Sequence, residues 1–374
     1  MVRGGLYMGN NKPRDPSLDL IRCIALFCVI SVHFFLNTGF YEEPVVGISM
    51  LMPVILRCSF MICVPLFIML TGFLNRVSIP SPVYYLKLCK PIFIYVAASF
   101  LCALYKMLVQ QTGLSILGAI AGIFSFTTAP YSWYMEMYLG LYLLIPFLNT
   151  LYHHLETQAR RQSLLLTLLA LTALPGMLNI FSIAGPDWWI RPSLSSEYHP
   201  VVPQWWTMLY PITYFFLGSY LRDHPLRLKP RTGMAMILLT ILLSGLFNFY
   251  RSYGNTFIEG PWQDYGSPFI VLLAMLVFSF FREWNPERLH PGIKGLLAWI
   301  SELALGAYLT SWIFDQCIYS KLTALVPDFQ QRTKFFFITV PLVFLGSLLS
   351  SALIRLACSA TIEKLLDRQK LHAA

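Results

Sequence analysis

Residues 17–36 read SLDLIRCIALFCVISVHFFL, and this stretch decides the fold. It is almost wholly apolar and, as a helix, about long enough to cross a hydrocarbon core ~30 Å thick. It nevertheless contains Arg22 and His33, and ionisable side chains are costly at membrane depth. At eleven positions apart, the two residues share one helix face and stand ~16 Å apart along the axis. We therefore predict a membrane helix whose Arg and His line an interior path.

The composition of the whole chain is that of a membrane protein. Of its 374 residues, 56% are hydrophobic and 12% are charged, whereas soluble domains carry about 25% charged residues. We predict an all-α, polytopic membrane helical bundle that forms a single domain over residues 1–374. The net charge of +9 does not indicate nucleic-acid binding, because the Lys and Arg residues fall mainly in alternate loops.

We predict ten membrane-spanning helices with both termini in the cytoplasm. In this topology 18 Lys and Arg residues lie in inside segments and 5 in outside loops, as the positive-inside rule requires. The short apolar stretch Leu114–Phe126 is expected to be interfacial or re-entrant. The predicted spans are 18–36, 48–74, 86–109, 131–150, 163–183, 204–221, 233–250, 266–281, 296–319 and 335–357.

Neither a cleaved leader nor a metal site is expected. The first apolar run has no small-residue cleavage site after it and contains Arg and His, so it is predicted to be an uncleaved span. The eight Cys residues form no CxxC pair and show no metal-ligand spacing. We interpret them as small apolar packing residues.

Each ionisable residue of the first stretch has two interpretations. His33 is suited to act as a general base, because neutral imidazole takes protons from hydroxyl groups near neutral pH; a hydrogen bond to a neighbouring helix is the alternative. Arg22 can clamp an anionic ligand such as phosphate, or it can pair with Asp19 or extend to lipid head groups. Asp19 is then a helix cap or the partner that orients Arg22.

Four later segments, together with the first, resemble in order the helix signatures of the membrane acyltransferase-3 family. They are RCSFMICVPLFIMLTGFLN from Arg57, YLKLCKPIFIY from Tyr85, YSWYMEMYLGLYLLIPFLN from Tyr131 and ELALGAYLTSWIF from Glu302. The chain departs from the family pattern at three positions. Cys23 stands in place of a Gly, Thr71 in place of a Ser, and Ser311 in place of a His.

The resemblance implies transfer of an acyl group, most simply acetyl, from acyl-coenzyme A to a hydroxyl of a sugar or glycolipid. It makes His33 the base and Arg22 an essential partner. Two groups ~16 Å apart cannot both touch one carbonyl, so Arg22 is assigned to the phosphate-bearing end of coenzyme A and His33 to the thioester. The partners expected are acyl-coenzyme A, a sugar acceptor and the lipid bilayer of a bacterial cytoplasmic (inner) membrane, with no permanently bound cofactor and no nucleic acid.

Further candidates extend this site. Arg57, Lys87 and Lys90 are predicted to contact the donor, although Arg57 also fits a structural tie and the two Lys residues fit ordinary positive-inside charges. Glu136, one turn into its span, could orient His33 or bind an acceptor hydroxyl. The predicted substrate-binding residues are Trp133, Tyr134 and Tyr308, and Asp315, two turns after Tyr308, is a weaker pocket candidate.

Two outside segments, Ala184–Gln204 and Arg251–Ser267, combine aromatic residues with carboxylates. Such groups suit a sugar acceptor, but an aromatic belt at the membrane interface explains them as well. Their candidate residues are Asp187, Trp188, Trp189, Arg191, Glu197, Tyr198, His199, Glu259, Trp262, Asp264 and Tyr265.

Two other functional classes compete with acyl transfer. A secondary transporter for an organic anion or proton-coupled solute also needs intramembrane Arg, His and Glu, but we find no inverted repeat with matching broken helices. A membrane scaffold leaves the shared face of Arg22 and His33 unexplained. Direct transfer of the acyl group and an acyl-His relay both remain open at this point.

Overall fold

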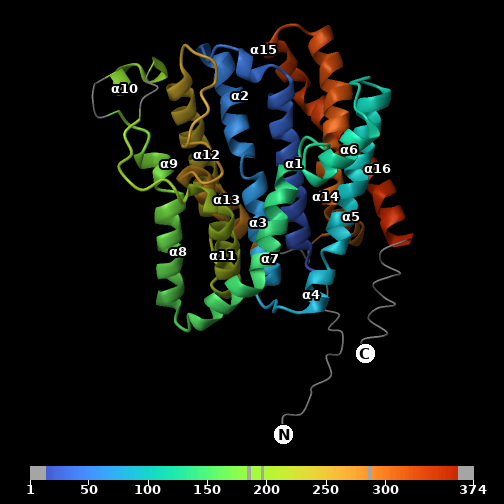
Figure 1. Cartoon of the computed structure of the whole chain (residues 1–374). Helices are drawn as coiled ribbons and strands as arrows, with labels where there is room; N and C mark the ends of the chain where they lie inside the picture. The colour runs from blue at the N-terminus through green and yellow to red at the C-terminus, as the bar shows by residue number, and fades with distance from the viewer. Residues whose placement is uncertain (1–13, 183–186, 195–197, 285–288, 361–374) are drawn as a thin grey trace.

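The structure is a computed structural model that describes residues 14–182, 187–194, 198–284 and 289–360, and its regular elements there are helices (Figure 1). Two isolated β-bridges join residues 44–45 to residues 253–256. The predicted all-α class is therefore confirmed for the described residues. The helices are α1 (Pro16–Asn37), α2 (Gly47–Phe60), α3 (Cys63–Asn75), α4 (Pro82–Leu86), α5 (Cys89–Leu108), α6 (Ile116–Phe124), α7 (Trp133–His154), α8 (Gln158–Thr172), α9 (Pro175–Leu178), α10 (Asp187–Ile190), α11 (Tyr210–Asp223), α12 (Pro230–Ser252), α13 (Pro268–Arg282), α14 (Pro291–Leu325), α15 (Phe329–Arg332) and α16 (Phe336–Cys358).

Helix α1 lies in the interior of the bundle. It begins at a favourable cap, because the Asp15 carboxylate accepts a hydrogen bond from the Ser17 amide and Pro16 occupies the first turn. Its apolar residues are buried, among them Ile21 and Ile30. The helix packs against α2, α3, α13, α14 and α16. Residues 17–36 therefore lie at the centre of the fold.

Among the described residues, six helical segments are long and apolar enough to cross a membrane. They are Pro16–Asn37, Gly47–Asn75, Pro82–Leu108, Pro230–Ser252, Pro291–Leu325 and Phe329–Cys358. Helices α8, α11 and α13 have only 15, 14 and 15 residues, which gives lengths of ~21–23 Å, shorter than a ~30 Å hydrocarbon core. The membrane class is supported, but the predicted count of ten complete spans is not confirmed.

The predicted second span is broken into two helices. Helix α2 ends at Phe60, and α3 begins at Cys63 after a tight turn in which the Met61 amide donates to the Cys58 carbonyl at 3.3 Å. Pro65 lies in the first turn of α3, where its missing N–H costs no helical hydrogen bond. We therefore attribute the break to residues 64–67 (VPLF), the segment that contains this Pro.

Helices α1 and α14 run parallel. Arg22 contacts Ser301 near one end of the pair, and His33 contacts Ser311, ten residues further along α14. The same face of α1 therefore meets α14 along its length, as the spacing of Arg22 and His33 predicts.

Helix α16 runs back along α14. The Ser351 hydroxyl, late in α16, donates to the Leu303 carbonyl at 2.7 Å, whereas Gly346 packs on Phe314, further along α14. Helix α16 therefore ends at the end of the bundle where α1 begins. The placement of both termini in the cytoplasm stays a prediction.

Candidate active site

A cavity of about 240 Å³ lies between α1, α3, α5, α7 and α14. Pockets for drug-sized ligands start at about 300 Å³, so this space suits an extended arm more than a whole bulky ligand. On α14 it extends over two turns, or ~10 Å. Its lining residues are Arg22, Val29, Val64, Phe67, Leu70, Thr71, Leu74, Asn75, Pro91, Tyr134, Tyr138, Ser301, Glu302, Ala304, Leu305 and Tyr308.

Arg22 marks the end of the cavity nearest the start of α1. Its Nη1 donates to the Ser301 hydroxyl at 2.5 Å, and the Asp19 Oδ1 is 3.6 Å away. The side chain is one-quarter exposed. A guanidinium has five N–H donors, so these contacts leave donors for a planar anionic group such as phosphate.

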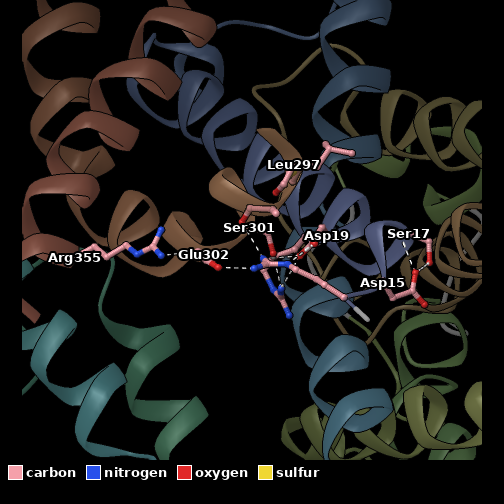
Figure 2. A network of polar contacts seen from close by, with 11 residues as sticks. Asp15, Ser17, Asp19, Leu297, Ser301, Glu302 and Arg355 are labelled. Atoms are coloured by element: carbon pink, nitrogen blue, oxygen red, sulfur yellow. Dashed lines mark hydrogen bonds and ion pairs between the residues drawn. The ribbon is translucent and has the colours of Figure 1, made fainter. Parts of the chain in front are cut away.

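The carboxylate of Asp19 is held by Arg14 more closely than by Arg22. Arg14 donates to the two Asp19 oxygens at 2.6 and 2.9 Å, a bidentate pair. Arg14 also pairs with Glu302, which pairs in turn with Arg355 of α16 (Figure 2). Three guanidiniums thus face two carboxylates, and the mouth of the cavity keeps a positive charge that Arg22 can offer to an anion.

His33 lies one turn beyond Val29, the last cavity residue on α1. Its Nδ1 is 3.4 Å from the Asp315 Oδ2 and 3.4 Å from the Ser311 hydroxyl. Its ring stacks on Tyr131, with centroids 3.7 Å apart. The imidazole is therefore buried and held from two sides.

Asp315 is a fully buried carboxylate on α14. The Tyr131 hydroxyl donates to its Oδ2 at 2.8 Å, and its Oδ1 has no hydrogen-bond partner among the described residues. An ionised Asp315 accepts from Nδ1–H of His33, which leaves the lone pair on Nε2. The polar contacts of the His33 imidazole with the described residues are made at Nδ1, so Nε2 is the atom that can take a proton. This is the arrangement of a general base with an orienting acid.

The structure brings three predicted residues together around the cavity, namely Arg22, Tyr134 and Tyr308. The ring centroids of Tyr134 and Tyr308 are 5.7 Å apart, and those of Tyr308 and His33 are 6.3 Å apart. The Tyr308 hydroxyl also donates to the Tyr131 carbonyl. Tyr308 therefore links the cavity to the buried His33.

A family model described as an acyltransferase domain (Acyl_transf_3) matches residues 15–356, nearly the whole chain. The chain belongs to this acyltransferase-3 family. No curated protein and no solved structure matches the chain. The matched range contains every cavity residue as well as His33 and Asp315.

Glu136 and Trp133 of this acyltransferase lie outside the cavity wall. Glu136 is exposed in the first turn of α7, and the position beside His33 that it was expected to occupy is taken by Asp315. Trp133 is also exposed and stacks on Tyr265, with ring centroids 5.7 Å apart. On α7, Trp133 therefore points outward and Tyr134 points into the cavity.

The basic donor candidates are split between two places. Lys87 and Lys90 are exposed around the start of α5, and Pro91, next to Lys90, lines the cavity. Arg57 is buried on α2, away from the cavity wall. Lys90 thus adjoins a cavity residue in the sequence, whereas Arg57 lies away from the cavity.

Arg57 ties α2 to the segment that follows α12. It donates to the Tyr41 hydroxyl at 2.9 Å, to Glu259 at 3.3 Å and to the Gln263 side-chain oxygen. Its guanidinium also lies 5.0 Å from the centre of the Phe257 ring. These contacts favour the structural interpretation of Arg57.

The aromatic residues of the two predicted outside segments surround another buried Arg. Arg251 lies 4.7 Å from the centre of the Trp188 ring and 4.6 Å from that of Trp262, and it donates to the Tyr198 hydroxyl at 2.9 Å. Both indole rings are buried, so they do not offer a free stacking face to a sugar. The Glu197 candidate lies outside the described residues, as do the side chains of Asp187 and Trp189.

The partners of His33 are only weakly marked in the sequence. Asp315 was only a weak candidate, although a carboxylate inside an apolar stretch with no basic neighbour requires a partner on another helix. Ser311 was noted only as a departure from the family pattern. Tyr131 gave no signal, because a Tyr at a helix start is typical of interfacial anchors.

Proposed function

We propose that this acyltransferase is a bacterial inner-membrane O-acyltransferase. In this proposal it transfers an acyl group, most simply acetyl, from acyl-coenzyme A to a hydroxyl of a cell-envelope sugar or lipid-linked glycan. One observation carries the proposal: the His33–Asp315 pair lies one turn past the end of a cavity that starts at Arg22. Family membership supports the acyl-transfer chemistry.

The donor would bind with its phosphates at the mouth and its pantetheine arm in the cavity. Arg22 would hold phosphate through its free donors, supported by the positive charge of Arg14 and Arg355. Lys87 and Lys90 would add charge at the same end. Since Arg22 and His33 stand ~16 Å apart on α1, the thioester at the tip of the arm would lie near the imidazole. Nothing in this scheme needs a permanently bound cofactor.

The proposed reaction is a single displacement at the thioester carbonyl. The Nε2 of His33 removes the proton of the acceptor hydroxyl, and the hydroxyl oxygen forms a bond to the carbonyl carbon. The tetrahedral intermediate then expels the thiolate of coenzyme A. This thiolate takes the proton from the imidazolium. The negative charge of Asp315 stabilises the imidazolium for as long as His33 carries the proton. The products are an ester and free coenzyme A.

The test is acyl transfer by the purified protein in lipid nanodiscs or by membranes that contain it. Labelled acetyl-coenzyme A is supplied, and free thiol and alkali-labile acetate on envelope glycans are measured. His33→Ala should lower kcat by about 10²–10⁴-fold, the contribution of a general base. Arg22→Ala should instead raise KM for acetyl-coenzyme A, and Arg22→Lys should recover only part of the loss, because Lys lacks the bidentate fork.

His154→Ala is the matched control, because His154 lies at the far end of α7 and contacts the Thr150 carbonyl. It should leave both constants unchanged. Full activity of a folded His33→Ala protein would remove His33 from the mechanism. Solute uptake by the wild-type protein without release of coenzyme A would instead indicate a transporter.

A further inference from the structure

A second cavity, of about 390 Å³, lies where several helices end. Helix α8 ends there at Thr172, α9 contributes Asn179 at its cap, and α11 begins there with Tyr210. The segment before α13 closes the remaining side. The lining residues are Thr172, Pro175, Gly176, Asn179, Gln204, Thr207, Met208, Tyr210, Pro261, Asp264, Tyr265 and Gly266.

The two cavities lie beside opposite ends of α11. At the C-terminal end of α11, Asp223 pairs with Arg76, which follows Asn75 of the first cavity. At the N-terminal end of the same helix, Tyr210 lines the second cavity. The 14 residues of α11 separate these two levels by ~20 Å. A ligand in the second cavity would therefore approach from the side opposite to the mouth that holds Arg22.

The chemistry of the second cavity differs from that of the first. Its polar groups are hydroxyls, amides and one carboxylate, and its lining contains no Lys, Arg or His. Two Tyr rings, Tyr210 and Tyr265, supply flat apolar faces with centroids 5.8 Å apart. Such a lining suits an uncharged ligand with many hydroxyl groups, whereas a phosphate would meet the carboxylate of Asp264.

Asp264 gives this cavity a strong acceptor. Desolvation raises the pKa of its carboxyl group, and the nearby Arg57 opposes that shift. An ionised Asp264 accepts two or more hydrogen bonds from hydroxyl donors, and such charge-assisted bonds are stronger than neutral ones. Arg57, which Tyr41 and Gln263 hold in place, thereby gains a second role as a charge near this acceptor.

A chain of aromatic rings leads from the second cavity to His33. Tyr265 stacks on Trp133 at 5.7 Å, and Trp133 contacts Tyr134 at 6.3 Å. Tyr134 and Tyr308 then line the first cavity, and the Tyr308 ring lies 6.3 Å from His33. Tyr265 lines the second cavity, and Tyr134 and Tyr308 line the first. These rings together with Trp133, here called the aromatic partition, lie between the two cavities, and the imidazole of His33 lies beyond Tyr308.

We propose that the second cavity is the acceptor subsite, which holds an uncharged sugar unit through Asp264 and the two Tyr rings while one sugar hydroxyl reaches toward His33. This inference rests on the proposed acyl transfer and adds to it where the acceptor binds and what charge it carries. Coenzyme A and the acceptor would then enter from opposite ends and meet at the aromatic partition.

The test blocks the second cavity from outside. Met208 is exposed and lines the cavity, so Met208→Cys offers a thiol to a membrane-impermeant polyethylene glycol maleimide. Modification should lower alkali-labile acetate on envelope glycans at least 10-fold. The affinity of the purified protein for coenzyme A, the probe for the donor cavity, should stay within about 2-fold. Val201→Cys is the matched control, because Val201 is exposed nearby but lies outside the lining, and its modification should leave transfer unchanged.

A second variant tests the charge without a bulky group. Asp264→Asn keeps the shape of the side chain and should lower transfer about 10-fold at limiting acceptor without a change in coenzyme A affinity. Transfer that survives both the block at Met208→Cys and Asp264→Asn would overturn the acceptor assignment alone. Loss of coenzyme A binding on modification would also overturn it, because the cavity would then belong to the donor path. If the unmodified wild-type protein adds no acyl group, the proposed function itself fails.

Discussion

At the scale of single residues, the site depends on which partner each buried charge finds. Asp315 lies beside Nδ1 of His33, and Tyr131 supports both groups by a hydrogen bond and by ring stacking. Arg14 occupies the carboxylate of Asp19 and so leaves Arg22 able to bind an anion. Both groups proposed to act on substrate are thus prepared by a neighbour that does not touch the substrate.

Asp315→Asn tests the orienting role of the carboxylate. An amide can turn its NH₂ group toward Nδ1, which favours the tautomer whose Nε2 carries the proton and cannot act as a base. We expect kcat to fall about 10²-fold, near the lower end of a general-base contribution, with KM for acetyl-coenzyme A within about 2-fold.

The matched variant is Asp315→Glu, which keeps the charge and should restore part of kcat. A purely structural role would lower the melting temperature and change KM together with kcat. If Asp315→Asn retains wild-type kcat, the carboxylate does not orient the base.

At the scale of elements, α3 and α11 cross in close contact. A Cβ on Gly72 would lie 2.0 Å from the Phe215 carbonyl oxygen, and a Cβ on Gly218 would lie 2.0 Å from that of Met69. The Ser219 hydroxyl donates to the Gly72 carbonyl at 3.1 Å across the same crossing. Small residues and interhelical hydrogen bonds of this kind are what bring helices together in a membrane. This crossing holds the wall of the first cavity next to the helix that starts at the second.

Gly72→Ala should destabilise the protein by about 1–3 kcal/mol, because the added methyl group meets backbone atoms that cannot move aside. Thermal unfolding in detergent measures the change. Gly140→Ala is the control, since a Cβ there meets no atom within 4 Å and Ala favours a helix over Gly. Equal melting temperatures for the two variants would show that the α3–α11 contact is looser than the structure places it.

At the scale of the whole molecule, two cavities of different charge lie at different levels of one bundle. The first has Arg22 at its mouth, near the start of α1 and the end of α16. The second contains Asp264 and lies at the opposite end of α11. Helices α8 and α11 are short and end within the height of the bundle (Figure 1). The second cavity lies where they end, at Thr172 and Tyr210.

This arrangement predicts labelling from opposite sides of the membrane. Leu74 lines the first cavity and is exposed, and Met208 lines the second. A membrane-impermeant maleimide should label Met208→Cys on right-side-out vesicles and Leu74→Cys only on inverted vesicles. The wild-type protein gives the background, because its described Cys residues are buried or only partly exposed. Labelling of both variants from the same side would contradict the opposed cavities.

The sequence by itself determined the properties that depend on neighbouring residues. Apolar runs predicted helices and a membrane protein, and the spacing of Arg22 and His33 placed both on the face of α1 that meets α14. Segments with ordered family motifs indicated an acyltransferase, and the family match confirms this. These features are local because a helix fixes the direction of each side chain from its position along the axis.

Only the tertiary structure decided which distant residues meet. Asp315, 282 positions after His33, took the place expected for Glu136. The segment after α12 supplies a hydrogen-bond acceptor to Arg57. Trp188 and Trp262 are buried against the guanidinium of Arg251. The reason is physical: a buried charge must find a partner in a medium that solvates it poorly, and which helix supplies that partner depends on the packing of the whole bundle and not on the residues beside it.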